Sequence, residues 1–182
     1  MQAKVGRSSL RRKAHLLSRR QDLQLVDIRG NIPTRLDKVM QGELDAVVLA
    51  HAGLQRLDLL KRAQANGLTF SCLDLQDVCP APAQGALAVQ IRRDDEQTNH
   101  IVRTLHHAET AKAVETEREL LRRFAGGGCH LPLGAYCEVA GTDLFLRALV
   151  AAPPDGSRRI EAAGTAIEPF LGVGKPSLRA TD

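Results

Sequence analysis

One cysteine of this sequence follows three consecutive glycines, in the run Gly126-Gly127-Gly128-Cys129. Glycine has no side chain and accepts backbone angles that other residues avoid, so a bulky group can approach the main chain beside the thiol. An ionised thiol is a nucleophile. The run therefore predicts a reactive thiol or a covalent attachment point at Cys129. The alternative interpretation is a flexible turn before a strand that begins near Leu133.

Arginine dominates the basic residues of the chain, since 19 of the 25 Lys and Arg residues are arginines and the net charge is +4. A guanidinium group binds a carboxylate or a phosphate through two parallel hydrogen bonds. The chain has no Trp, one Tyr and four Phe, which leaves few rings on which nucleic-acid bases could stack. We therefore expect a small polyanion as ligand, in preference to nucleic acid.

The four cysteines, at positions 72, 79, 129 and 137, have neither the paired spacing of a zinc site nor the density of a secreted disulfide scaffold. Reduced thiols, a cytoplasmic location and no bound metal are expected. No apolar run has the length of a membrane span. Residues 1–21 contain no acid, which leaves a mitochondrial targeting peptide as an alternative, although the same residues also predict folded structure.

Hydrophobic periodicity in the first half predicts strands that alternate with helices. Strands are expected at Lys4-Val5, at 23–28 and at 46–50, the last of them buried on both faces. Helices are expected from Ser8 or Ser9 to about residue 20, and from 31–33 to about residue 43. The residues expected to face the core are Leu10, Ala14 and Leu17 in the first helix and Leu36, Val39 and Met40 in the second. This order predicts a parallel sheet, which binds ligands at the carboxyl ends of its strands.

Two helix N-termini should then point at one crevice. Each presents free backbone N–H groups and the positive end of a helix dipole. Arg11 and Arg12 fall in the first turn of the first helix, Arg35 falls in that of the second, and Arg29 lies on the turn between them. The pattern predicts an anion-binding pocket. Solvated surface charge is the alternative, and we prefer it for the two arginines at the far end of the first helix, Arg19 and Arg20.

The middle of the chain, 57–82, has a mixed pattern that ends in a hinge near 80–85. A strand is expected at 86–91, a polar helix at 94–106 and an amphipathic helix at 109–124. On the last helix we expect ion pairs from Glu115 to Arg118 and from Glu119 to Arg123. Its expected buried residues are Ala113, Val114, Leu120, Leu121 and Phe124.

The last third of the chain has the pattern of an antiparallel sheet. Strands are expected at 133–139, 144–151 and 158–166, with turn residues at 141–142 and 153–156 between them. Residues from 168 onward have no clear period and are expected to be disordered. The predicted fold class is α/β, with a parallel βαβ domain followed by a small α+β domain.

Several motifs occur in a fixed order along the chain: VGRSSLRR at 5–12, RGN at 29–31 with TRL at 34–36, AGLQRL at 52–57, QGAL at 84–87, and GGC at 127–129 with a tyrosine at 136. Together they resemble hydroxymethylbilane synthase, also called porphobilinogen deaminase. The resemblance extends from about residue 4 to residue 165. That family joins four porphobilinogen molecules into hydroxymethylbilane for tetrapyrrole and haem biosynthesis and releases ammonia at each step.

The resemblance implies a covalent cofactor and a set of binding residues. The family builds its product on a dipyrromethane held by a thioether to a cysteine, and Cys129 matches that cysteine. The acetate and propionate groups of the cofactor and of the growing chain require cationic partners. The matching residues are Ser9, Arg11, Arg12 and Arg29 for the cofactor, and Arg35 and Arg56 for the substrate.

The resemblance also implies the domain organisation. Residues 1–85 would form the central anion-binding domain, which is periplasmic-binding-protein-like and incomplete. Residues 86–107 would be a crossover segment that belongs to a first domain, 108–167 the C-terminal domain that carries the cofactor, and 168–182 a tail.

Two positions depart from the pattern of the family, and one residue of the family has no match. Arg7 stands where a small hydroxyl residue is usual, and Ala83 stands where glycine precedes Gln84. The aspartate that moves protons in the family has no match, so no catalytic residue is assigned, and Asp27, Asp94 and Asp95 are interpreted as surface or turn residues.

The chain would lack the first domain and the C-terminal end, as a truncated or degenerate copy. The strand at 86–91 would then be an unpaired apolar edge, and the chain would be poorly stable or would associate through it. Bilane formation by the chain alone is not expected. The missing domain could come from a separate polypeptide. The alternative function is an anion-binding module, for oligopyrrole or nucleic acid, without catalysis.

Overall fold

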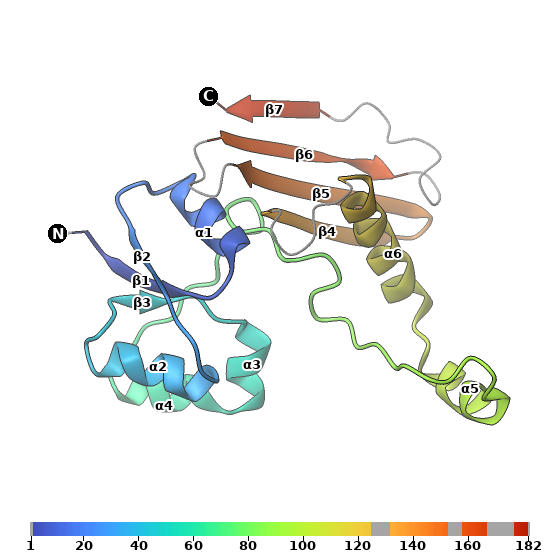
Figure 1. Ribbon diagram of the computed structural model, residues 1–182, viewed down its shortest axis with the longest axis horizontal. Helices are drawn as coiled ribbons and strands as arrows, with labels where there is room; N and C mark the ends of the chain where they lie inside the picture. The colour runs from blue at the N-terminus through green and yellow to red at the C-terminus, as the bar shows by residue number, and fades with distance from the viewer. Residues whose placement is uncertain (1, 125–131, 153–157, 167–176, 182) are drawn as a thin grey trace.

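A computed structural model describes residues 2–124, 132–152, 158–166 and 177–181. Cys129 lies in the segment 125–131, outside these residues. The described elements form two units, a parallel sheet with helices α1 to α4 and an antiparallel sheet with helix α6 (Figure 1). A long connecting segment, residues 66–95, runs between the units without a regular helix or strand.

The first unit contains a three-stranded parallel sheet in the order β2-β1-β3, made of β1 (Lys4–Arg7), β2 (Gln24–Asp27) and β3 (Ala46–Val47). Helix α1 (Leu10–Leu17) connects β1 to β2, and α2 (Ile32–Met40) connects β2 to β3. Both helices begin at a polar cap, because Ser9 accepts a hydrogen bond from the Arg12 amide and Asn31 accepts one from the Thr34 amide. The predicted β-α-β-α-β order is confirmed, and α1 ends three residues earlier than expected.

The run 46–50 is not the strand that its apolar sequence predicts. Strand β3 has only two residues, and both Ala46 and Ala50 are exposed. In the described sheet β3 lies at an edge and pairs with β1 alone. Residues 46–50 are all exposed or half-buried, so the prediction of burial on both faces is wrong.

Two short helices follow β3, α3 (His51–Arg56) and α4 (Leu59–Ala65), and the second lies where the sequence shows only a mixed pattern. They pack against α2 through a cluster of buried residues. Its members are Leu36, Leu54, Leu59 and Ala63. These helices are too short to show a clear hydrophobic period in the sequence, and their apolar residues are buried because they pack against α2.

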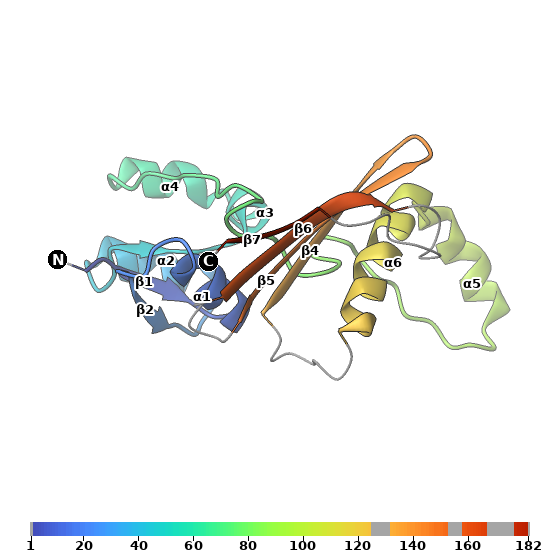
Figure 2. The same cartoon turned by 90° about the horizontal axis from the view of Figure 1, so that it is seen from above.

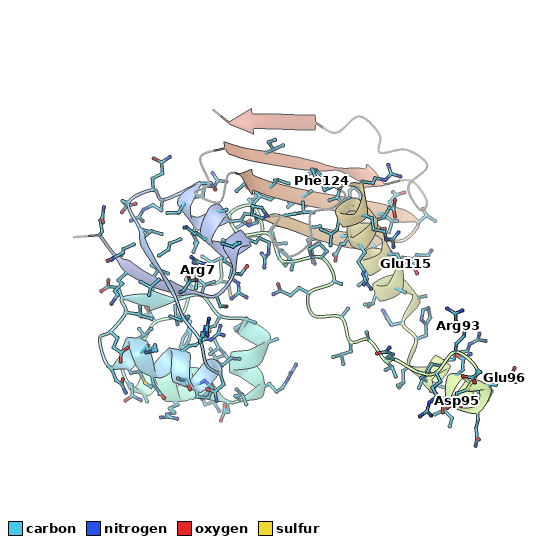
Figure 3. The ribbon with its side chains drawn as sticks, in the orientation of Figure 1. Arg7, Arg93, Asp95, Glu96, Glu115 and Phe124 are labelled. Atoms are coloured by element: carbon cyan, nitrogen blue, oxygen red, sulfur yellow. The ribbon has the colours of Figure 1, made fainter. Side chains whose placement is uncertain are left out.

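The connecting segment contains no strand at 86–91, so that prediction is wrong. A strand needs a neighbouring backbone to satisfy its N–H and C=O groups, and no described strand runs beside these residues. Leu87 is 96% exposed and Val89 is 59% exposed, as expected for an apolar segment without a partner. The polar helix that follows is confirmed as α5 (Glu96–Val102) with the 3-10 turn η1 (Arg103–Leu105). It stands apart from both sheets, as the labels of Arg93 and Glu96 in Figure 3 show.

The second unit is an antiparallel sheet in the order β4-β5-β6-β7, covered on one face by α6 (Ala108–Arg123) (Figure 2). Its strands are β4 (Leu133–Ala140), β5 (Asp143–Ala152), β6 (Arg158–Ala166) and β7 (Ser177–Thr181). The three predicted strands are confirmed. The expected disorder of the tail is wrong for residues 177–181, because their backbone pairs with β6.

Four of the residues predicted to be buried on α6 are half-buried, namely Ala113, Val114, Leu120 and Leu121, but its most buried residues were not predicted. Thr116 and Glu117 are its buried residues, whereas Phe124 follows the last helical turn and is 48% exposed. The ion pair between Glu119 and Arg123 is present at 3.2 Å. The prediction assumed that α6 packs one apolar face against a single surface. In the structure α6 contacts both β4 and the connecting segment, and the Glu117 carboxylate is buried between them.

The two units meet at α1 and at residues 79–84. The Pro80 carbonyl accepts a hydrogen bond of 2.9 Å from the Ala135 amide in β4. On α1, the fully buried His15 lies with its Nε2 3.2 Å from the Pro132 carbonyl oxygen. The helix that carries Arg11 and Arg12 is therefore docked beside the start of β4. No helix in the described part of the chain is long and apolar enough to cross a membrane.

Candidate anion-binding site

The N-termini of α1 and α2 are joined by one arginine at the carboxyl edge of the parallel sheet. Arg35, in the first turn of α2, donates from Nη1 to the Ser8 hydroxyl at 2.9 Å and from Nε to the Gly30 carbonyl at 2.8 Å. Ser8 directly precedes the cap of α1, and Gly30 precedes the cap of α2. The expectation that both helix starts meet at one edge is confirmed, because a single side chain touches both.

Arg12 supplies a second guanidinium group at this edge, and Arg12 and Arg35 together are called the arginine cluster below. Its Nη1 donates to the Val48 carbonyl at 3.1 Å, directly beyond β3. Burial lowers the pKa of Arg12, and the positive charge of Arg35 lowers that pKa further. Arg12 binds directly beyond β3 and Arg35 directly beyond β1, and these strands are neighbours, so both positive charges lie at one edge of the sheet. Such a pair repels, and a bound anion would relieve the repulsion.

Arg11 faces the connecting segment. It donates to the Cys79 carbonyl oxygen, and its Nη2 lies 3.4 Å from Oε1 of Gln84. Burial lowers the pKa of Arg11 to about 10, and the charge of Arg12 contributes in the same direction. The group therefore stays protonated at neutral pH. Part of its hydrogen-bonding capacity is used by the protein itself, which the sequence did not indicate.

In the described part of the chain, the side chains of the other predicted site residues form no hydrogen bond with the side chain of Arg12 or Arg35. Ser9 caps α1 through its hydroxyl oxygen, 3.5 Å from the Arg12 amide nitrogen. Arg29, on the turn before α2, and Arg56, the last residue of α3, are both exposed. Cys129 lies outside the described residues. The structure thus places Arg12 and Arg35 at one edge of the sheet, while the binding roles of all the predicted site residues stay predictions.

Two ionic features near these residues were missed by the sequence analysis. Arg7, the last residue of β1, is buried and forms an ion pair of 2.7 Å with Asp27, the last residue of β2. Glu117 on α6 is buried and accepts backbone hydrogen bonds from Ala83 and Cys137. The first was not indicated by the sequence, because the predicted strands were Lys4-Val5 and 23–28, whereas the observed strands end at Arg7 and Asp27, which are register partners. Nothing in the sequence pairs Glu117 with either of its partners.

A separate depression of about 550 Å³ lies on the antiparallel sheet. Cys137 packs toward α6, and side chains alternate along a strand, so Tyr136 and Glu138 of β4 line the opposite face. None of the predicted site residues that the structure describes lines this depression. It is therefore not the predicted anion site.

The structure is that of an α/β protein with Arg12 and Arg35 at the carboxyl edge of a parallel sheet. Residues 1–100 match the family model described as "Porphobilinogen deaminase, dipyromethane cofactor binding domain". Residues 111–175 match the model of the porphobilinogen deaminase C-terminal domain. The chain belongs to the porphobilinogen deaminase family.

Curated relatives agree with this assignment. Porphobilinogen deaminases from Xanthomonas campestris pv. campestris (strain B100) and Xanthomonas axonopodis pv. citri (strain 306) are each 46% identical over 154 residues, which cover 85% of this chain and 48% of theirs. The protein of the same name from Xanthomonas oryzae pv. oryzae (strain PXO99A) has the same identity and coverage. The chain therefore spans about half the length of the curated relatives it matches.

Proposed function

We propose that this chain holds the primer and the growing oligopyrrole of a hydroxymethylbilane synthase. Cys129 carries the dipyrromethane through a thioether. The carboxylates of the pyrrole chain bind to the arginine cluster at the carboxyl edge of the parallel sheet. The observation that carries the proposal is that Arg35 binds Ser8 and Gly30, at the starts of two capped helices, while Arg12 binds Val48 at the same edge of the sheet.

The described residues suit a cofactor rich in carboxylates. Arg12 and Arg35 each use a guanidinium nitrogen to bind the protein, which orients the planar group and leaves further N–H donors on it. Two helix N-termini add backbone donors and the positive ends of their dipoles. When bound, the dipyrromethane supplies the pyrrole ring to which substrate is joined. Ser9, Arg29 and Arg56 would extend this binding surface along its rim.

Arg11 would hold the cofactor and the connecting segment at the same time. Its contacts with Cys79 and Gln84 tie α1 to residues 79–84, which themselves contact β4. The residue that neutralises a carboxylate of the primer is therefore also part of the joint between the two units. We expect primer binding and the order of this joint to depend on each other.

The proposed domains follow the same division, with residues 1–85 as a periplasmic-binding-protein-like anion-binding domain, 86–107 as a crossover and 108–167 as the cofactor-attachment domain. The activity proposed for the complete enzyme is the joining of four porphobilinogen molecules with release of ammonia. No residue of this chain is assigned to proton transfer, so we expect residues 1–182 by themselves not to turn over porphobilinogen. A cytoplasmic location remains part of the proposal.

Intact-mass analysis of the chain, expressed in a haem-producing cell, tests the proposal. A dipyrromethane adduct is expected on the wild-type chain and on Cys72→Ala, and it should be absent from Cys129→Ala. Cys72 is the matched control because it is an exposed thiol outside the proposed site. An unmodified wild-type chain, or an adduct that survives loss of Cys129, would contradict the attachment.

The affinity for single-stranded DNA, measured at increasing salt concentration, distinguishes the alternative function from the proposed one. A nucleic-acid binder would lose affinity steeply with salt and would be unaffected by Cys129→Ala. Steep salt-dependent DNA binding together with an unmodified thiol would favour an anion-binding module without a pyrrole cofactor.

A further inference from the structure

Arg7 and Asp27 form an ion pair at the edge of the sheet where the anion site lies. They are register partners at the last positions of β1 and β2. Two parallel contacts join them, Nη1 to Oδ1 at 2.7 Å and Nη2 to Oδ2 at 3.3 Å. The next residue after Arg7 is Ser8, which Arg35 binds, so the pair adjoins the arginine cluster. Figure 3 labels Arg7 within the parallel-sheet unit, well away from Glu115 on α6.

The two members of the pair differ in their exposure. The side chain of Arg7 is only 7% exposed, whereas that of Asp27 is 76% exposed. The Nε of Arg7 is buried and has no hydrogen-bond partner among the described residues. A buried guanidinium with an unsatisfied donor costs free energy, so this cation is not fully compensated by the protein. Its counter-charge sits on a side chain that water, and therefore a ligand, can reach.

The geometry of the pair is the one that a ligand carboxylate would adopt. A carboxylate binds a guanidinium best through two parallel N–H···O contacts, and the oxygens of Asp27 already make both. A carboxylate from solution would have to displace Asp27 to bind Arg7 in this way. Arg7 is thus a cation beside the anion site, and the carboxylate of Asp27 already occupies its guanidinium group.

We infer that Asp27 is a specificity-determining residue that occupies Arg7 and so limits how many ligand carboxylates the site accepts. The inference rests on the proposed function, because it concerns the same anion site. With Asp27 in place, the site binds carboxylates through Arg12 and Arg35. When the charge of Asp27 is removed, Arg7 becomes available to one more carboxylate.

Isothermal titration calorimetry of the full chain with benzene-1,3,5-tricarboxylate at low ionic strength tests this. Asp27→Asn should bind the tricarboxylate about tenfold more tightly, since one charge-assisted hydrogen-bonded contact is gained. Asp27→Glu retains a carboxylate on a longer, exposed stem, so its affinity should stay within about twofold of wild type. The gain of Asp27→Asn should disappear in the double variant that also carries Arg7→Gln.

Asp22→Asn is the matched control, because it removes one exposed carboxylate that pairs with Arg20 before β2 begins, at the opposite edge of the sheet. An equal gain in Asp22→Asn would mean that only net charge matters, and it would overturn the inference. So would an unchanged affinity in Asp27→Asn, or a gain that persists without Arg7.

The outcome for Arg35→Gln distinguishes this inference from the proposed function. If Arg35→Gln weakens binding while Asp27→Asn does not strengthen it, the inference alone fails. If the wild-type chain does not bind the tricarboxylate and neither substitution changes that, the inference and the anion site fail together.

Discussion

Replacement of Glu117 by alanine should weaken the joint between α6, the connecting segment and β4. The carboxylate accepts the amide of Ala83 at 2.6 Å through Oε2 and the amide of Cys137 at 2.8 Å through Oε1. The residue is 6% exposed, so water has little access to amides that lose this partner. An unsatisfied buried amide costs about 1–3 kcal/mol, and two of them predict a loss of about 3 kcal/mol in the free energy of unfolding for Glu117→Ala.

Glu117→Gln keeps the side-chain volume and changes the hydrogen bonding, so it distinguishes the two effects on the free energy of unfolding. The amide oxygen of glutamine can accept one of the two backbone N–H groups, but its NH₂ group faces the other with a donor. Glu117→Gln should therefore cost about half as much as alanine, roughly 1.5 kcal/mol. Urea denaturation followed by circular dichroism gives these values, and hydrogen exchange at the amides of Ala83 and Cys137 reports the contact directly.

Glu119→Ala is the control, two residues further along the same helix. Glu119 forms ion pairs with Arg122 and Arg123 at the surface, and its loss should cost no more than about 0.5 kcal/mol. A cost for Glu117→Ala as small as that of Glu119→Ala, with unchanged exchange at the two amides, would refute the reasoning.

The stability of the chain should also depend on pH through Glu117. Burial raises the pKa of this carboxyl above its ordinary value of 4.5, and the hydrogen bonds from Ala83 and Cys137 oppose the shift only in part. Over a window just above pH 4.5, the folded chain therefore holds a proton that the unfolded chain has lost. The contribution of this proton to stability is complete below that window and is lost as the pH rises through it. In Glu117→Gln this part of the pH dependence should vanish.

Two further predictions concern the same joint. Ala83 has a positive φ of 63°, which favours glycine, so Ala83→Gly should raise the free energy of unfolding by about 0.5 kcal/mol. Ala81 has no positive φ, so Ala81→Gly should lower the free energy of unfolding. Equal effects of the two substitutions in urea denaturation would contradict this prediction. Burial, and next the charge of Glu117, raise the pKa of the Cys137 thiol to about 11, so iodoacetamide at pH 8 should alkylate the exposed Cys72 long before Cys137, as peptide mass spectrometry would show.

The local elements of the fold could be predicted from the sequence, because their signals lie within a few neighbouring residues. Ser9 and Asn31 cap the two helices that they were expected to begin. The turn at 141–142 sets the register of β4 against β5 over eight residue pairs. The meeting of Arg12 and Arg35 at one edge also follows from local order, since successive parallel strands place their carboxyl ends together.

The failed predictions concern residues whose environment comes from distant segments. The apolar runs at 46–50 and 86–91 suit a buried strand, but the first lies at a sheet edge and the second has no neighbouring strand among the described residues. Phe124 is apolar and yet half exposed because α6 ends before it. Hydrophobicity predicts that a residue favours burial, and it does not say whether a partner surface is present.

The sequence by itself determined the family, the order of helices and strands, and the arginines available to an anion, because all of these depend on residue type and short-range spacing. Only the tertiary structure decided that Arg7 pairs with Asp27, that Arg11 binds the connecting segment and that Glu117 joins three segments. These contacts join residues 20 to 68 positions apart. A charged side chain takes whichever partner the packed backbone brings within reach, and that partner is set by the fold as a whole.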